Sequence, residues 1–354
     1  MPETFIFNKP FQLESGEILP GFRLAYTTYG RLNETKSNVA WVFHALTANS
    51  DPAEWWPGLV GTGKLLDPSS NFIICVNIPG SCYGSTGPLN INPRTGTPWY
   101  HDFPFFTTRD MIRAYRHLRI SLGIQKIRIG IGGSMGGQQL LEWAIEEPGL
   151  FEHIFPIATN AFHSPWGIAF NASQRACIET DVTWKKKQPQ AGMQGMKTAR
   201  GLALLSYRHY ETYQKDQSEA IPGKLVAYRA ESYQKYQGEK LGARFNAFSY
   251  YTLSRSMDAH DVGRGRGHAL AALGKIKAKT LVIGISSDIL FPVREQQFIA
   301  EAIPGAVFRT ITSDYGHDGF LLEYDQITKL LQEHFEREDP PKTTDQPLTI
   351  THLF

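Results

Sequence analysis

The feature that most constrains the fold is a glycine-rich junction between a short apolar run and a helical segment. Isoleucines alternate with other residues over 127–131, which predicts a buried strand. Residues 138–147 contain no glycine or proline and carry apolar residues at helical spacing, so they predict a helix that ends before Pro148. Between the two, residues 132–137 read G-G-S-M-G-G. This G-x-S-x-G motif, placed between a strand and a helix, is typical of a nucleophile elbow.

An elbow places its serine on a tight, strained turn, so the neighbouring residues must lack bulk. Ser134 would then project at a helix N-terminus, where backbone N–H groups stabilise negative charge. The alternative is a loop that holds a phosphate. No Lys-Ser/Thr pair follows the glycines as in a P-loop, and the G-x-G-x-x-G spacing is absent. The sequence therefore favours a nucleophilic serine.

Composition excludes several classes of protein. The chain has 354 residues, of which 42% are hydrophobic and 20% charged, enough for one large α/β domain with an insertion or for two domains. The formal net charge is only +2 and no basic block occurs, so we expect no nucleic-acid partner and no membrane surface. The N-terminus lacks the apolar core of a signal peptide. Three unpatterned cysteines favour a reduced, cytoplasmic setting.

The order of predicted elements gives the domain organisation. Strands and helices alternate up to about residue 158, give way to helical patterning rich in Tyr, Gln, Arg and Lys, and alternate again from residue 279. We predict an α/β core from residues 1–162 and 271–340, a helical lid at 163–270 and a C-terminal tail at 341–354. Within the lid, the G-R-G-R-G-H segment at 263–268 is expected to be a mobile or variable loop.

Two further residues complete a catalytic triad with Ser134. Asp288 follows the predicted strand at 280–285, and His317 follows the next one at 307–312. The order Ser, Asp, His is that of the α/β-hydrolase fold, with a mostly parallel sheet that builds its site at the carboxyl ends of the strands. His317 would take the serine proton, and Asp288 would orient the imidazole.

The oxyanion hole is expected from two backbone N–H groups. One belongs to Met135, directly after the serine, and the other to Leu46, in the loop after the strand at 38–44. His44, at the end of that strand, is given no chemical role. Cys82 lacks an elbow context and is interpreted as a packed cysteine. No spacing of histidines or cysteines predicts a metal site, so we expect none.

Motifs along nearly the whole chain resemble the homoserine O-acetyltransferases of the α/β-hydrolase superfamily. They include His44-Ala-Leu-Thr, Cys82-Tyr-Gly-Ser-Thr-Gly-Pro, Tyr236-Gln-Gly-Glu-Lys, Gly284-Ile-Ser-Ser-Asp and Tyr315-Gly-His-Asp-Gly, together with the elbow itself. The resemblance implies an acetyl group moved from acetyl-CoA to Ser134 and then to the hydroxyl of L-homoserine, for methionine synthesis. Acetyl-CoA would be a co-substrate, with no other cofactor. The family also implies a homodimer formed through the lid.

The resemblance further implies an arginine and an acid that hold the amino acid. Asp318 fits the acid, because it adjoins His317, and Arg200 fits the arginine, with Arg208 and Arg255 as its rivals. A guanidinium suits the substrate carboxylate and a carboxylate suits its ammonium. Three alternatives stay open. Succinyl-CoA or L-serine could replace one substrate, water could be the acceptor as in an esterase, or the chain could be a non-catalytic binding protein on this scaffold.

Overall fold

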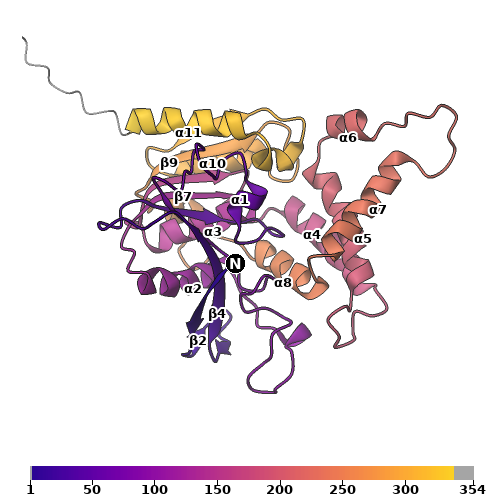
Figure 1. Cartoon of the computed structure of the whole chain (residues 1–354), viewed down its shortest axis with the longest axis horizontal. Helices are drawn as coiled ribbons and strands as arrows, with labels where there is room; N and C mark the ends of the chain where they lie inside the picture. The colour runs from indigo at the N-terminus through magenta and orange to yellow at the C-terminus, as the bar shows by residue number, and fades with distance from the viewer. Residues whose placement is uncertain (1, 339–354) are drawn as a thin grey trace, which may run out of the picture.

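The computed structural model describes residues 2–338 and shows one twisted sheet with helices on both faces (Figure 1). The order of strands in this sheet is β1-β4-β6-β5-β7-β8-β9-β10. β4 pairs antiparallel with β1 and with β6. The remaining pairs, β6–β5, β5–β7, β7–β8, β8–β9 and β9–β10, are parallel. The strands are β1 (Glu3–Phe7), β4 (Phe22–Tyr29), β5 (Val39–Phe43), β6 (Phe72–Val76), β7 (Ile127–Gly133), β8 (Phe151–Ile157), β9 (Lys279–Ile285) and β10 (Val307–Ile311). β2 (Phe11–Gln12) and β3 (Ile18–Leu19) form a separate small pair. The α/β-hydrolase architecture predicted from the sequence is confirmed.

The central strand β5 shows how the core is built. All five of its side chains are buried, because helices cover both faces of a parallel sheet. Trp41 and Phe43 pack against Trp143, with ring centroids 4.8 and 6.0 Å apart. Val42 points to the opposite face, into the cluster that contains Leu331. The helices of the core are α1 (Pro52–Trp55), α2 (Thr108–Ser121), α3 (Met135–Glu146), α10 (Val293–Ala302) and α11 (Tyr324–Glu338), with short 3₁₀ helices η1 (Tyr100–Asp102) and η2 (Gly316–Leu321).

The helical lid lies between β8 and β9. It consists of α4 (Pro165–Glu179), α5 (Met193–Tyr207), α6 (Tyr210–Gln217), α7 (Arg229–Gly242), α8 (Ala247–Asp258) and α9 (Ala269–Leu273). Figure 1 shows α5, α6 and α7 standing to one side of the sheet, while α8 lies closer to it. The predicted lid boundary at residue 270 falls inside α9, whose Ala272 and Leu273 are buried in the main core cluster.

The segment at 263–268, expected to be a mobile or variable loop, is held by ion pairs. Arg264 reaches Glu14 at 2.9 Å. Arg266 reaches Glu142 at 2.6 Å and Glu146 at 2.8 Å, and Arg109 of α2 shares Glu142 at 2.6 Å. The Glu142 side chain is only 1% exposed, so its charge needs these partners. The arginines of this segment therefore join the lid to α3 and to the N-terminal region.

Within residues 2–338 we find no helix long and apolar enough to span a bilayer. The predicted tail at 341–354 lies outside the described residues.

Candidate active site

The nucleophile elbow is formed where β7 meets α3. Ser134 has φ 56° and ψ −125°, a left-handed backbone that residues other than glycine rarely adopt. A Cβ at Gly132 would overlap the backbone of Gly136, and one at Gly136 would overlap the Phe43 carbonyl oxygen. These close approaches explain the glycines on either side of the serine. Ser134 itself is 5% exposed, and it lines the cavity described below.

Asp288 and His317 meet at the carboxyl ends of β9 and β10. The Nδ1–H of His317 donates to Oδ2 of Asp288 at 2.6 Å. The other carboxylate oxygen, Oδ1, accepts the backbone N–H groups of Leu290 at 2.8 Å and Phe291 at 2.9 Å. The imidazole stacks on the Phe291 ring with centroids 5.0 Å apart and an interplanar angle of 25°. The carboxylate is thus held from both sides, and the imidazole is held by the carboxylate and by an aromatic face.

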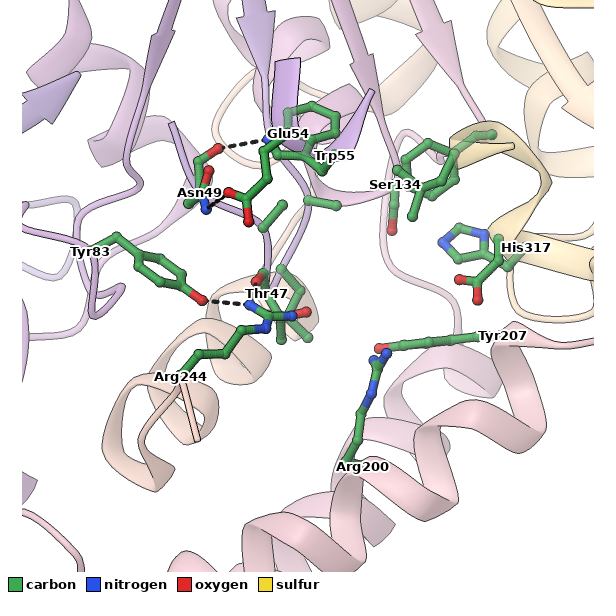
Figure 2. A pocket seen from close by; sticks show the side chains of 16 residues that line it. Thr47, Asn49, Glu54, Trp55, Tyr83, Ser134, Arg200, Tyr207, Arg244 and His317 are labelled. Atoms are coloured by element: carbon green, nitrogen blue, oxygen red, sulfur yellow. Dashed lines mark hydrogen bonds between the residues drawn. The ribbon is translucent and has the colours of Figure 1, made fainter. Parts of the chain in front are cut away.

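A cavity of about 400 Å³ brings Ser134 and His317 together under the lid (Figure 2). Leu46, expected as an oxyanion donor, lines the same cavity. Met135, the other expected donor, is the first residue of α3 and is completely buried beside it. The cavity therefore lies between the elbow, the loop after β5 and the inner side of α5, which carries Arg200 and Tyr207.

Of the three arginines considered for the substrate carboxylate, only Arg200 lines this cavity. Its guanidinium lies 5.5 Å from the centre of the Tyr207 ring, and among the described residues it forms no ion pair. Arg208 instead pairs with Asp318, its Nε donating to Oδ2 at 2.8 Å. Arg255 lies over the ring of Phe105, away from Ser134. Among these three arginines, the geometry favours Arg200 as the partner of a bound carboxylate, and its role stays a prediction.

The Asp318 carboxylate also lines the cavity, but it already carries one cationic partner. The Arg208 side chain is 23% exposed and that of Asp318 is 13% exposed, so the pair is only partly screened by water. One carboxylate oxygen is used by Arg208, while Oδ1 has acceptor capacity left for an ammonium group. Sequence reasoning did not pair Arg208 with Asp318, because 110 residues separate them.

Sequence reasoning also missed the residues at the far side of the cavity. Arg244, between α7 and α8, donates to the Thr47 carbonyl and to the Tyr83 hydroxyl. Figure 2 shows this contact across the cavity from Arg200, with Glu54 and Asn49 close by. The amide of Asn49 donates to Glu54 at 2.8 Å. The one sequence signal for this side of the cavity was the unusual length of the loop at 79–104, which carries Tyr83.

Among residues 2–338, we find no cluster of three or more His, Cys, Asp or Glu side chains that is arranged to hold a metal ion. Cys82 is partly buried, and burial raises the pKa of its thiol to about 11. A thiol of this kind is a poor nucleophile at neutral pH, because the thiolate is the reactive form. Ser134, which lines the cavity as Cys82 does not, is therefore the better candidate for the nucleophile.

Comparison with known proteins agrees with this geometry. A family model described as the alpha/beta hydrolase fold matches residues 42–324. The homoserine O-acetyltransferase of Cyclobacterium marinum is 50% identical over 333 residues, which cover 94% of this chain and 95% of that protein.

Two solved structures are similar over almost the whole chain. The homoserine O-acetyltransferase from Bacillus anthracis aligns with a TM-score of 0.87 at 25% identity, over 95% of this chain and 98% of that one. An acetylester hydrolase from Corynebacterium glutamicum aligns with a TM-score of 0.85 at 29% identity, over 95% and 96%. The same scaffold thus occurs in a transferase and in a hydrolase, so the choice of acceptor must be argued from the cavity.

Proposed function

Because this chain belongs to the homoserine O-acetyltransferase family of the α/β-hydrolase fold, we propose that it draws its acetyl group from acetyl-CoA and passes it through an acyl-enzyme on Ser134. The protein is an enzyme that transfers an acetyl group to L-homoserine, a step of methionine biosynthesis. What we propose is the donor, the two-step course and the role of each residue.

The first step would form the acyl-enzyme. His317 takes the proton of the Ser134 hydroxyl, and the serine oxygen attacks the thioester carbonyl. The backbone N–H groups of Leu46 and Met135 would stabilise the resulting oxyanion. The C–S bond then breaks, and the proton held by His317 passes to the departing thiolate, so that CoA leaves as a thiol. Asp288 stays ionised throughout and stabilises the imidazolium.

The second step would use the same groups in reverse. His317 takes the proton of the homoserine hydroxyl, and that oxygen attacks the acetyl carbonyl. The tetrahedral intermediate collapses, the serine oxygen leaves and regains its proton from His317, and O-acetyl-L-homoserine is released. Arg200 would hold the substrate carboxylate and Asp318 its ammonium group, which places the hydroxyl near Ser134.

The observation that favours acetyl transfer over hydrolysis is the pair of opposite charges beside the nucleophile. Arg200 and Asp318 line the cavity of Ser134 and His317, and they match the two charged ends of an amino acid. An esterase for neutral esters has no need of such a pair. The acetylester hydrolase from C. glutamicum has the same fold, so water is the competing acceptor that the substrate test below must exclude.

Replacing Arg200 with alanine is expected to lower kcat/KM for homoserine about 10²- to 10³-fold. The substitution removes the guanidinium that would pair with the carboxylate of bound homoserine. The loss should fall mainly on KM for homoserine, while the first, CoA-releasing step stays within about threefold of wild type. Steady-state and single-turnover CoA release would measure the two effects. Arg255→Ala, which removes a guanidinium outside this cavity, is the matched control. An unchanged KM for homoserine in Arg200→Ala would show that another residue binds the substrate carboxylate.

We also propose that the enzyme is cytoplasmic and forms a homodimer through the lid. Large apolar side chains lie exposed on the lid and support such an interface: Val182, Leu205, Ile221, Leu225 and Val226.

The substrates are tested by CoA thiol release with acetyl-CoA or succinyl-CoA, each with L-homoserine, with L-serine or with no acceptor. We expect sustained turnover only with acetyl-CoA and L-homoserine. Rapid turnover without an added acceptor would mean that water accepts the acetyl group, and it would favour the esterase interpretation. A preference for succinyl-CoA or for serine would overturn the proposed substrates and leave the triad chemistry in place.

A further inference from the structure

The buried histidine at the end of β5 has no role in the mechanism given above. His44 is 0% exposed, and both of its ring nitrogens are hydrogen-bonded. Nε2 lies 3.0 Å from the backbone nitrogen of Ile78, whose N–H can only donate. Nε2 is therefore the acceptor, and the proton of the neutral ring lies on Nδ1. Nδ1 in turn lies 2.8 Å from the carbonyl oxygen of Ala45 and donates to it.

Burial makes this neutral form the stable one. It lowers the pKa of His44 to about 4, although the Ala45 carbonyl favours the charged ring. A protonated ring would have no acceptor left for the Ile78 N–H. At neutral pH the imidazole therefore keeps one donor and one acceptor in fixed places.

The bond to Ala45 controls the next amide group along the chain. A trans peptide is planar, so the Ala45 carbonyl and the Leu46 N–H point in opposite directions. Holding that carbonyl against the buried imidazole turns the Leu46 N–H away from the imidazole. Ala45, Leu46 and Ser134 all line the cavity of the active site.

The backbone of His44 is also attached to the helix that carries the other oxyanion donor. Nε2 of Gln139 donates to the His44 carbonyl at 3.3 Å and to the Met135 carbonyl at 3.0 Å. A Cβ at Gly136 would lie 3.3 Å from the His44 carbonyl oxygen, which shows how closely the first turn of α3 packs here. His44 thus connects the end of β6, the loop after β5 and the start of α3.

We propose that His44 is a positioning residue, whose neutral imidazole fixes the Ala45–Leu46 peptide so that the Leu46 N–H is aimed as the second oxyanion donor. This inference rests on the proposed acyl transfer at Ser134. His44 touches no reacting atom and acts only through the peptide that it holds.

Two substitutions of His44 test the two hydrogen bonds of the ring separately, because each removes only one of them. The amide nitrogen of asparagine replaces Nδ1, so His44→Asn keeps the donor to Ala45 and loses the acceptor for Ile78. The amide of glutamine reaches the place of Nε2, so His44→Gln keeps an acceptor for Ile78 and loses the donor to Ala45. Each variant loses one buried hydrogen bond, so a purely structural role predicts similar losses in both.

We expect kcat of His44→Gln to fall about 10²- to 10³-fold, the effect of losing one oxyanion-hole donor. KM for homoserine should change less than about threefold, because the bond is used in the transition state. His44→Asn should keep kcat within about tenfold of wild type. Circular dichroism and thermal unfolding would verify that each variant is folded.

Equal losses of kcat in the two folded variants, or a fully active His44→Gln, would overturn the inference. If His44→Gln does not fold, His44→Asn decides alone: retained kcat supports the role, and a hundredfold loss in the folded protein contradicts it. Failure of the wild type to acetylate homoserine would instead overturn the proposed function, so the two failures are distinguishable.

Discussion

Replacing Ser134 with alanine is expected to lower kcat for O-acetylhomoserine formation by about 10⁴- to 10⁶-fold, the range seen when a serine nucleophile is removed. The other hydroxyls that line the cavity belong to Thr47, Tyr83 and Tyr207, none of which lies on an elbow, and burial raises the pKa of the thiol of Cys82, next to Tyr83, to about 11. The small residual rate would come from bound substrates and the oxyanion hole alone. Product formation followed by chromatography would measure it.

The matched control for this variant is Ser206→Ala. Ser206 is also buried, and its hydroxyl donates only to the Ala203 carbonyl within α5. Ser206 itself does not line the cavity, so its loss should leave kcat within about twofold. Wild-type levels of product from a folded Ser134→Ala protein would show that the nucleophile lies elsewhere.

The second large effect is expected from Asp288→Asn, which should lower kcat about 10⁴-fold by fixing the wrong tautomer of His317. The backbone N–H groups of Leu290 and Phe291 both point at Oδ1 of residue 288. They require the amide oxygen there, so the NH₂ group would face Nδ1 of His317. Nδ1 would then be an acceptor, and the imidazole proton would move to Nε2, which could no longer take a proton from Ser134.

Asp314→Asn is the control, because Asp314 is the exposed acid close to His317 in sequence. We expect its kcat within about twofold of wild type. Steady-state rates of both variants, with thermal unfolding to verify folding, would test this. An active Asp288→Asn enzyme, or a comparable loss in Asp314→Asn, would show that Asp288 does not orient the histidine.

Local pattern was sufficient to predict the elements that build the triad. The alternating isoleucines before Ser134 form β7, and the segments before Asp288 and His317 form β9 and β10. α3 starts at Met135, three residues before the start at Gln138 that the pattern predicts. Glycine is a poor helix former, so the sequence argues against a helix at 136–137, yet tight packing on β5 requires glycine in that first turn.

The contacts that complete the site depend on residues far apart in the sequence. Arg208 with Asp318 and Arg244 with Thr47 join the lid to the core across 110 and 197 residues. The ion pairs of Arg264 and Arg266 likewise could not be inferred from a segment that is rich in glycine. Such pairs are set by how the helices pack, and no local periodicity encodes them.

The most direct test of acyl transfer through Ser134 is the intact mass of the enzyme, measured milliseconds after mixing with acetyl-CoA alone and again after adding L-homoserine. We predict a mass gain of one acetyl group, located on Ser134 by peptide mapping, that disappears as O-acetyl-L-homoserine forms. Product formation without any acetylated enzyme, or an acetyl group that homoserine does not discharge, would contradict the two-step mechanism.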